Sequence, residues 1–276
     1  MRIALIQQHA TNDKQENLER GLEALEEAVA NGAELVCYAE LAFEPFYPQR
    51  PAGSDFKALA EPVPGPITES FSARAAEHGV VVVLNLFERD GDLTYDSSPV
   101  IDADGTLLGC TRMVHITDYP CFHEQGYYTP GDTGTPVYST KVGRIGVAIC
   151  YDRHYPEYMR ALALAGAQVV IVPQAGAVDE WPEGLYEAEM RVAAFQNGYY
   201  TALCNRVGEE ECLTFAGESF VCDPAGRIVG RAPALEDSIL YADLDLSEVD
   251  SSHARQLFLR DRRPELYARW LAKEPS

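Results

Sequence analysis

Short apolar runs alternate with helical patterns along the first two thirds of the chain, and this alternation limits the possible folds more than any other feature. Helices are predicted around residues 18–29, 67–78 and 156–165, where apolar residues recur at helical spacing or a proline stands in the first turn. The apolar runs between and beside them are predicted strands: RIALIQ, ELVCYAE, VVVVLNLF, RIGVAIC and AQVVIVP. Such alternation is typical of an α/β layered sandwich.

The later part of the chain is richer in strands, with YYTALCN, ESFVCD and RIVGRA as predicted strands. They follow a predicted helix with an apolar stripe that we expect to lie in the core, formed by Leu185, Ala188, Val192 and Phe195. Residues from about 246 to 276 are polar with scattered apolar anchors, which predicts a C-terminal arm packed on its own domain or on a neighbouring subunit. No repeat or Gly/Ser linker divides the chain, so we expect a single domain over residues 1–276.

The chain carries a strong negative charge. Its 276 residues include 43 acidic and 22 basic ones, which gives a formal net charge of -21. A field of this sign repels phosphate backbones and anionic lipid headgroups, so nucleic-acid and membrane binding are not expected. No apolar run approaches the length needed to span a bilayer, and the N-terminal sequence lacks the long apolar segment of a signal peptide. We therefore expect a cytoplasmic protein.

Seven cysteines are scattered along the chain, and none forms a CxxC pair. In a reducing compartment such thiols are mostly small buried hydrophobic side chains. We expect this for four that lie in or beside apolar stretches, namely Cys37, Cys110, Cys204 and Cys222. Cys212 follows an acidic run, and we expect it to be less buried.

Cys150 ends the predicted strand RIGVAIC, just before the start of a predicted helix. In α/β folds the carboxyl ends of strands open into a crevice, so a thiol at this place is a candidate nucleophile, with an inert buried thiol as the alternative. A nucleophile also needs a base. Glu40 ends the strand ELVCYAE, and two adjacent strand ends would put its carboxylate beside the thiol; an ordinary cap or loop carboxylate is the alternative.

Several motifs occur in the order in which they occur in the nitrilase superfamily of carbon–nitrogen hydrolases. They are ELAFEPFYP around Glu40, HEQGYYTPGDTG around Glu124 and GRIGVAICYDRHYPE around Cys150, followed by RVAAFQNGYY, NRVG, FAGESFVCDPAG and RRPELY. Together they cover nearly the whole chain, which resembles the amidase and N-carbamoyl amine amidohydrolase branch of that superfamily.

The resemblance implies a four-layer αββα sandwich that forms a homodimer or a higher homo-oligomer. It also implies hydrolysis of a non-peptide C–N bond in a small amide, carbamoyl amine or nitrile, through a thioester on the cysteine. Cys150 would be the nucleophile, Glu40 the general base, and Glu124 a second carboxylate that positions and polarises the site. The backbone N–H of Tyr151 would bind the oxyanion, together with a lysine.

Met113 stands where the resemblance places that lysine, because residues 112–116 read RMVHI instead of Arg-Lys-x-His-Ile. Loss of one oxyanion donor commonly lowers the rate by about 10²–10³. This loss is small compared with the total rate acceleration of an enzyme, so activity is still expected. Three interpretations stay open. Arg112 donates instead, or His115 or His123 of the same loop donates, or the site binds a ligand without turnover.

Other features complete the prediction. Gln174 follows the strand VVIVP and is a candidate for contact with the substrate. No phosphate loop, zinc motif or cofactor motif is recognised, so we expect neither a metal nor a cofactor. The expected partner is a small-molecule substrate, and the competing hypothesis is a catalytically weak binding or scaffold protein that kept the fold.

Overall fold

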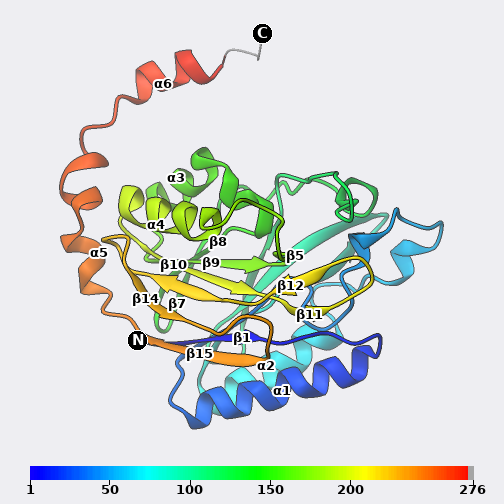
Figure 1. Cartoon of the computed structure of the whole chain (residues 1–276). Coiled ribbons are helices and arrows are strands. Elements are labelled where there is room, and N and C mark those ends of the chain that lie inside the picture. The colour runs from blue at the N-terminus through cyan, green and yellow to red at the C-terminus, as the bar shows by residue number, and fades with distance from the viewer. Residues whose placement is uncertain (273–276) are drawn as a thin grey trace.

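Two β-sheets face each other, and helices cover their outer faces, so that the layers follow the order α, β, β, α (Figure 1). The structure, a computed structural model, describes residues 1–272. Each sheet buries one apolar face against the other sheet and the second face against helices. The predicted α/β four-layer sandwich is thereby confirmed.

The first sheet has seven strands. Their order is β15 (Ser238–Asp243), β1 (Arg2–Gln7), β2 (Leu35–Tyr38), β3 (Val81–Val83), β5 (Leu93–Ile101) and β4 (Leu86–Asp90), with β6 (Leu107–Arg112) also paired to β5. β1, β2 and β3 run parallel, so their carboxyl ends lie at the same edge. The helices α1 (Lys14–Ala30) and α2 (Pro66–His78) cover the outer face of this sheet.

The second sheet has six strands. Their order is β14 (Ile228–Arg231), β13 (Phe220–Cys222), β10 (Tyr200–Asn205), β9 (Val169–Gln174), β8 (Gly143–Val147) and β7 (Val137–Thr140). β8, β9 and β10 are parallel, and the small hairpin of β11 (Val207–Glu209) and β12 (Thr214–Ala216) follows the carboxyl end of β10. The helices α3 (Pro156–Leu164) and α4 (Leu185–Asn197) cover the outer face.

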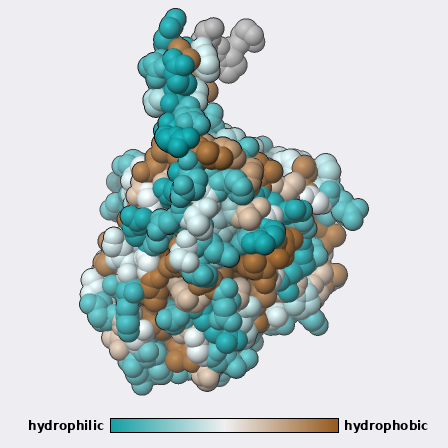
Figure 2. Space-filling view, turned by 90° about the vertical axis from the view of Figure 1, so that its left-hand side faces the viewer, coloured by the Kyte–Doolittle hydropathy of each residue, from teal (hydrophilic) through white to brown (hydrophobic). Residues whose placement is uncertain are grey.

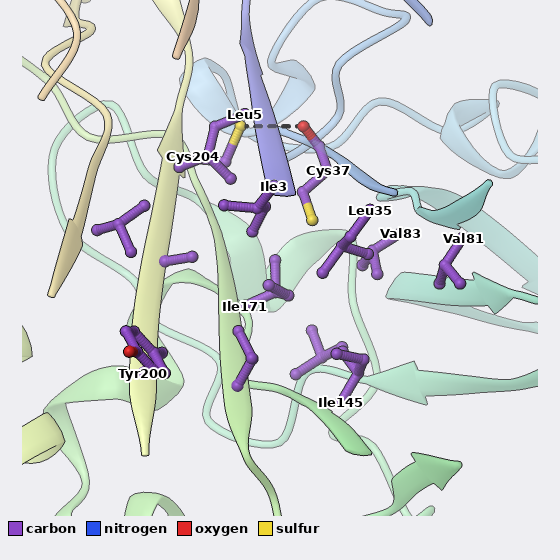
Figure 3. Packing of buried hydrophobic residues seen from close by; sticks show 14 of the residues in the cluster. Ile3, Leu5, Leu35, Cys37, Val81, Val83, Ile145, Ile171, Tyr200 and Cys204 are labelled. Carbon is purple, nitrogen blue, oxygen red and sulfur yellow. Dashed lines mark hydrogen bonds between the residues drawn. The ribbon is translucent and has the colours of Figure 1, made fainter. Parts of the chain in front are cut away.

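The layer between the two sheets is a continuous apolar core (Figure 3). Leu35 of the first sheet and Ile171 of the second are both fully buried in it. The sulfur of Cys204 on β10 lies 3.4 Å from the carbonyl oxygen of Cys37 on β2, within reach of a thiol hydrogen bond from one sheet to the other. This core therefore fixes how the carboxyl ends of the strands in one sheet face those in the other.

Local sequence explains where the helices begin and end. Asp13 is the N-cap of α1. Its side chain accepts hydrogen bonds from the backbone N–H groups of Gln15 and Glu16, which have no partner within the helix. The helix stops at Asn31 and Gly32, where the glycine takes a φ of 83° that favours residues without a Cβ. The proline-led start predicted at Pro156 is also confirmed.

The run VVVVLNLF is not one strand, as the sequence predicts, but two. β3 ends at Val83 and β4 begins at Leu86, so the chain leaves the ladder at Leu84 and Asn85. Asn85 is fully buried, and its side chain accepts a hydrogen bond from the backbone of Leu41 at 2.7 Å. A buried amide must find partners, and here it finds them by interrupting the strand.

The apolar stripe on α4 is not in the core. Leu185, Val192 and Phe195 are 42%, 50% and 37% exposed, so the prediction that this stripe is buried is wrong. The helix instead buries a neighbouring face, formed by Met190, Ala193, Ala194 and Asn197. Helical spacing alone identifies an apolar face, but it does not say whether that face packs on this chain or on another surface.

The C-terminal segment forms an arm, with α5 (Ser247–Ser251), a π-helical turn at Ala254–Phe258 and α6 (Pro264–Leu271). Phe258 packs on Phe195 of α4, with ring centroids 5.4 Å apart. α6 buries none of its residues and projects from the body (Figures 1 and 2). Residues 273–276 of the expected arm lie outside the described residues. Within residues 1–272, none of the helices has the length and apolar character required to cross a membrane.

Candidate active site

Cys150 lies just beyond the carboxyl end of β8, at the first residue of a 3-10 turn that runs to His154. Its φ is 44°, in the left-handed region that residues with a Cβ rarely adopt. Such backbone strain persists only where the surroundings hold it, and it is frequent at functional sites. The residue is 5% exposed, so the thiol lies almost wholly inside the protein.

Glu40 follows the end of β2 and is fully buried. The next residue, Leu41, also has a positive φ of 45°, and its N–H is held by Asn85. The guanidinium group of Arg206 donates to the backbone carbonyl of Glu40 at 2.9 Å. The chain around Glu40 is therefore fixed from two sides. Its carboxyl group accepts no hydrogen bond from an N–H or hydroxyl group within residues 1–272, but it lies within hydrogen-bond reach of the thiol of Cys150 and the carboxyl group of Asp96.

Glu124 comes from a long loop between β6 and β7, where it begins a short 3-10 turn. It is fully buried, and one of its oxygens accepts a long hydrogen bond of 3.4 Å from the backbone of Thr117. In the described part of the chain, its other oxygen has no partner.

The structure brings these three side chains together. One donor atom from each of Glu40, Glu124 and Cys150 lies within 4.8 Å of the other two. The sequence argument placed Glu40 and Cys150 on adjacent strand ends, but β2 and β8 belong to different sheets. The two groups meet because the sheets face each other, not because their strands are neighbours in one sheet.

Burial sets the electrostatics of this cluster. The pKa of Glu40 is raised to about 8, mainly by loss of water and next by the nearby Glu124. Burial, followed by Asp96, also raises the pKa of Glu124. The pKa of Cys150 is raised by burial and then by the two glutamates. A carboxyl with its pKa near 8 is suited to proton exchange with a neighbouring thiol near neutral pH.

Gln174 ends β9 and directs its side chain at the sulfur. Its amide nitrogen lies 3.2 Å from the sulfur of Cys150, and its amide oxygen accepts a hydrogen bond of 2.9 Å from Arg153. Arg153 also donates to the backbone carbonyl of Cys150 at 3.0 Å. Tyr151 follows in the first turn of the same 3-10 helix, where backbone N–H groups lack partners within the helix.

The other residues considered for the oxyanion lie in structural roles. Arg112 binds Glu88 through two nitrogens at 2.6 and 2.9 Å and also contacts Asp90 at 2.8 Å. Met113 is fully buried in the core between the sheets. An arginine held by two carboxylates would have to break both contacts to reach the thiol.

The histidines are similarly engaged. His115 lies 2.6 Å from a carboxylate oxygen of Asp152 and stacks on Tyr155, with ring centroids 3.5 Å apart. His123 lies 3.2 Å from Asp118. Both rings belong to the loop that also carries Glu124, and both have structural partners: His115 pairs with residues that follow Cys150, and His123 pairs with a residue of its own loop.

Sequence reasoning missed Asp96 and Asn85. Asp96 on β5 is 1% exposed and lies close to Glu40. Burial, followed by Glu40, raises the pKa of Asp96, whereas a hydrogen bond with Asp96 lowers the pKa of Glu40. Asn85 donates to Asp96 at 2.6 Å. The available signals were a single polar residue in the apolar run VVVVLNLF and an aspartate within a strand that is buried along nearly its whole length.

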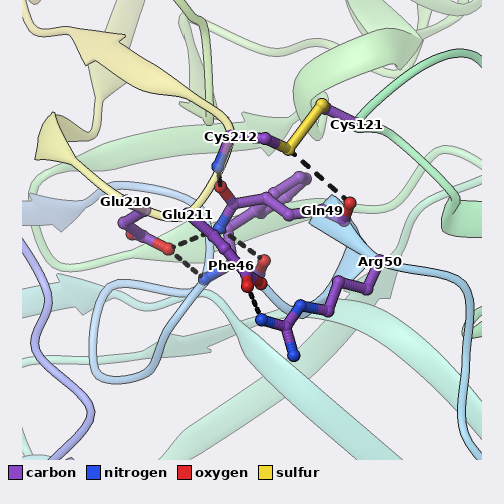
Figure 4. Close-up of a disulfide and its surroundings, with 7 residues drawn as sticks. All are labelled: Phe46, Gln49, Arg50, Cys121, Glu210, Glu211 and Cys212. Atoms are coloured by element: carbon purple, nitrogen blue, oxygen red, sulfur yellow. Dashed lines mark hydrogen bonds and ion pairs between the residues drawn. A yellow bond between two sulfur atoms is a disulfide. The ribbon is translucent and has the colours of Figure 1, made fainter.

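A disulfide between Cys121 and Cys212 was also missed (Figure 4). It joins the loop that carries Glu124 to the turn between β11 and β12, 91 residues later. The expectation of an exposed Cys212 is confirmed, and Cys37, Cys204 and Cys222 are buried free thiols, whereas Cys110 is only half-buried. The spacing of the cysteines in the sequence does not indicate this pair, because Cys121 and Cys212 come close together only in the folded chain.

A cleft of about 950 Å³ lies among residues that follow Glu40 and Glu124 in the chain, with Phe46, Tyr47 and Tyr127 in its lining. Cys150 does not line this cleft. Glu40, Glu124 and Cys150 are also the one group of three potential metal ligands this close together within residues 1–272; the expectation of no metal stays a prediction.

Comparison with known proteins agrees with this geometry. The family model described as carbon-nitrogen hydrolase matches residues 2–254. N-carbamoylputrescine amidase of Solanum lycopersicum is 36% identical over 279 residues, which cover 96% of this chain and 93% of that protein. A carbon-nitrogen hydrolase from Helicobacter pylori G27 has a similar crystal structure, with a TM-score of 0.89, 30% identity, and coverage of 100% of this chain and 99% of that one.

A solved structure of a variant amidase from Nesterenkonia sp. AN1 shows acrylamide added to its active-site cysteine. It has a TM-score of 0.83 and 29% identity, and the match covers 98% of this chain and 99% of that one. The chain described here is a member of the carbon–nitrogen hydrolase family, an enzyme of the nitrilase superfamily that acts on non-peptide C–N bonds.

Proposed function

We propose that the protein hydrolyses a small amide, carbamoyl amine or nitrile through a covalent intermediate on Cys150, with Glu40 as general base. The observation that carries this proposal is the approach of Glu40, Glu124 and Cys150 to within 4.8 Å in a chain of this family. A thiol is a weak nucleophile until a base removes its proton, and Glu40 is the carboxyl group best placed to do so.

The reaction on an amide proceeds in two halves. Glu40 takes the thiol proton, the sulfur adds to the carbonyl carbon, and the leaving nitrogen takes that proton as the C–N bond breaks. A thioester on Cys150 remains, or a thiocarbamate if the substrate is a carbamoyl amine. Glu40 then takes a proton from water, whose oxygen adds to the same carbon, and the C–S bond breaks to restore the thiol.

Glu124 acts on this reaction through Glu40. It lies beside Glu40 without a side-chain partner of its own among residues 1–272, and its charge raises the pKa of Glu40. It is also close enough to contact the nitrogen of a substrate bound at the thiol. We therefore assign Glu124 to the positioning of the base and of the leaving group.

The oxyanion is assigned to the backbone N–H of Tyr151 and the side-chain amide of Gln174. Gln174 is supported by its direction, because its amide nitrogen already faces the sulfur where the substrate would bind. Arg112 and His115 are not assigned to this role, because Glu88 and Asp152 hold them. Met113 contributes no donor. The N–H of Tyr151 and the amide of Gln174 would therefore bind the oxyanion through neutral hydrogen bonds, without the positive charge of a lysine at position 113.

We also infer a homo-oligomer that buries the exposed stripe on α4. The stripe is continued by Leu257 and Phe258 at the base of the arm, which are 43% and 38% exposed. Figure 2 shows apolar surface gathered where the arm leaves the body. Contiguous apolar patches of this kind usually mark protein contacts. A cytoplasmic location is inferred as well, because five of the seven cysteines are free thiols, as in a reducing compartment; the disulfide between Cys121 and Cys212 is the exception.

The test is an ammonia-release screen over amides, carbamoyl amines and nitriles, joined to intact-mass spectrometry. A good substrate should leave an acyl adduct that maps to Cys150. The adduct should be absent from Cys150→Ser. In Glu40→Gln it should form more slowly and then persist, because both halves of the reaction lack their base. Cys110→Ser, which alters a half-buried thiol on β6, is the control and should retain turnover. A thiol that never forms an adduct and resists iodoacetamide would instead support the binding or scaffold hypothesis.

A further inference from the structure

The acidic groups around the thiol are buried without a cationic partner in contact. Glu40, Asp96 and Glu124 are at most 1% exposed, and each has at least one carboxyl oxygen that accepts no hydrogen bond from an N–H or hydroxyl group within residues 1–272. Glu40 and Asp96 lie close enough to share a proton. Among those residues, no lysine, arginine or histidine nitrogen lies within 4.0 Å of any of the three carboxyl groups. The three carboxyl groups are therefore buried close to the thiol, and no cationic side chain contacts them.

The nearest cations are occupied elsewhere. Arg206 donates to the backbone carbonyls of Glu40 and Leu41 and pairs with Glu210. Arg153 donates to Gln174 and to the backbone of Cys150, and it lies 3.3 Å from Glu189. Their charges moderate the field at the site, but their N–H groups do not satisfy the three carboxyl groups.

A further acid borders the same space. Glu180 accepts hydrogen bonds from the hydroxyl groups of Tyr119 and Tyr186 and from the backbone of Ala177. It is close enough to Glu124 to raise the pKa of that residue. The surroundings of the thiol are therefore acidic on more than one side, whereas a neutral amide offers them no positive charge to bind.

Ionised carboxylates that are buried without a cation cost several kcal/mol each, and the cost is removed by a proton or by a cationic ligand. A ligand that pairs with two carboxylates at once needs N–H groups in a planar fork. Guanidinium and amidinium groups have this shape, and their hydrogen bonds to carboxylates are short and strong. The carbon at the centre of such a group would lie beside the sulfur of Cys150.

We propose that this site also hydrolyses the C–N bond of a small amidine or guanidine, which it binds as a cation between Glu40, Asp96 and Glu124. The proposal rests on the proposed function, because it uses the same thiol and the same base. It accounts for the lack of a basic side chain at position 113. Addition of a thiolate to an amidinium carbon gives a neutral adduct, so no oxyanion forms in the first step and no cation is needed to stabilise one.

The chemistry balances without any further reactant than water. Glu40 takes the thiol proton, and the sulfur adds to the amidinium carbon. One nitrogen takes the proton from Glu40 and leaves as ammonia, so a cationic thioimidate remains on Cys150. Water gives a proton to Glu40 and its oxygen adds to the same carbon. The C–S bond then breaks, the new hydroxyl group gives its proton to the sulfur, and the proton on Glu40 passes to the ammonia. The products are an amide, or a urea from a guanidine, and one ammonium ion, with the thiol and the carboxylate restored.

The test compares two probes of nearly equal shape, 2-chloroacetamidine and 2-chloroacetamide, which differ in charge. Their rates of alkylation of Cys150 are measured by intact mass in the full-length protein, and each is divided by its rate with a free thiol such as N-acetylcysteine. We expect the normalised rate of the amidine to exceed that of the amide at least about tenfold, which corresponds to about 1.4 kcal/mol. Ammonia release is then compared for acetamidine against acetamide, and for an alkylguanidine against the matching urea.

Charge variants connect the preference to the cluster. Asp96→Asn removes one carboxylate at constant shape and should lower the amidine preference about tenfold. Met113→Lys adds a positive charge to the buried cluster that also contains Cys150 and should abolish or reverse the preference, whereas the size-matched Met113→Leu should keep it. Because Asp96→Asn and Met113→Leu preserve shape, the test does not depend on whether Met113→Lys folds.

The outcomes separate the two proposals. Amidine preference with release of ammonia from amidines or guanidines supports the inference. An amide probe that reacts as fast as the amidine, with turnover of amides only, overturns the inference and leaves the proposed function intact. Fast amidine alkylation without any release of ammonia from amidines or guanidines overturns the second activity. If neither probe modifies Cys150, the proposed function fails, and the inference fails with it.

Discussion

The side-chain nitrogen of Gln174 lies 3.2 Å from the sulfur of Cys150, while Arg153 holds the oxygen of the same amide. Arginine can only donate hydrogen bonds, so it decides which end of the amide faces the thiol. Gln174 is therefore presented to the reacting centre as a donor, and its own position depends on Arg153, which is 4% exposed.

Replacement of Gln174 should slow the chemical step. In Gln174→Ala we expect kcat to fall by about 10²–10³, as for loss of one oxyanion donor, with KM changed much less. Gln174→Glu keeps the shape and the contact with Arg153 but places an acceptor beside the sulfur, so it should be at least as slow. Steady-state kinetics together with the rate of iodoacetamide alkylation measure both effects. Wild-type kcat in both variants would remove Gln174 from the mechanism.

Activity should increase with pH up to about 8. Glu40 acts as a base only when ionised, and its pKa is raised to about 8 by burial and by Glu124. A pH profile of kcat/KM on a neutral substrate should therefore rise through neutral pH with a midpoint near this value. In Glu124→Gln the charge that raises the pKa of Glu40 is absent, so any remaining activity should have its midpoint at lower pH. A midpoint that does not move would show that Glu124 does not act through Glu40.

Stability should show the opposite trend. The folded protein keeps a proton on Glu40 up to about pH 8, whereas the unfolded chain loses it near 4.5. More protons are bound in the folded state over this interval, so the contribution of Glu40 to the free energy of unfolding falls as pH rises from about 4.5 to about 8. Glu40→Gln has no carboxyl group at this position, so its free energy of unfolding lacks this decrease with pH. Its advantage in Tm over the wild type should be larger at pH 8.5 than at pH 5, and an equal difference at the two pH values would contradict the assignment.

Arg112 should stabilise the fold without taking part in the reaction. Its partner Glu88 is 3% exposed, so Arg112→Gln leaves a buried carboxylate unpaired and should cost about 3–5 kcal/mol in the free energy of unfolding. Asp90→Asn removes a more exposed contact of the same arginine and should change stability by less than about 1 kcal/mol. Chemical denaturation measures both.

The same variant decides whether Arg112 donates to the oxyanion. If Arg112 is structural, kcat of the folded fraction of Arg112→Gln at low temperature should stay close to wild type. A loss of about 10² in kcat at unchanged stability would show that the guanidinium reaches the substrate after all.

The disulfide should hold the loop that carries Glu124. Cys121 lies three residues before Glu124, and its bond to Cys212 closes a loop of 91 residues. Reduction, or Cys212→Ser, should cost about 2–4 kcal/mol of stability and should lower kcat. Titration of the denatured, unreduced protein should find five free thiols. Cys212→Ser is the control for the reductant, because its stability should not respond to it; seven free thiols in the wild type would rule the bond out.

The stripe on α4 should mediate self-association. Val192→Glu introduces charge at a residue that is 50% exposed in one chain, and we expect it to shift the protein towards monomer in light scattering after size-exclusion chromatography. Leu93→Glu changes an equally exposed residue, 49%, at the start of β5 and should leave the assembly as it is. Wild-type protein that is already monomeric at micromolar concentration would contradict the inferred oligomer.

Much of this fold could be predicted because local and global preferences agree. Asp13, Asn31 and Pro156 mark helix boundaries by backbone chemistry that does not depend on distant partners. The strand that ends before Cys150 is apolar because both of its faces are covered. A strand of this kind can be recognised in the sequence as a continuous apolar run.

The remainder depends on contacts between distant parts of the chain. The break at Asn85 follows from bonds to Leu41 and Asp96, which no window of sequence contains. The exposure of Val192 is decided by which face of α4 packs on β10 and β13, and periodicity is the same for either choice. Cys121 and Cys212 approach only because a loop and a hairpin meet at one end of the sandwich.

Glu40 and Cys150 are held by strands of opposite sheets, so the gap between them depends on the thickness of the apolar layer below. Interiors are packed as densely as organic crystals, and a methylene added or removed there shifts backbone positions. Leu35 and Ile171 in that layer are remote from any proton transfer, yet their volumes set the spacing at which it takes place. Heat-resistant variants obtained by repacking this interior should therefore often differ in turnover, although no reacting group has been replaced.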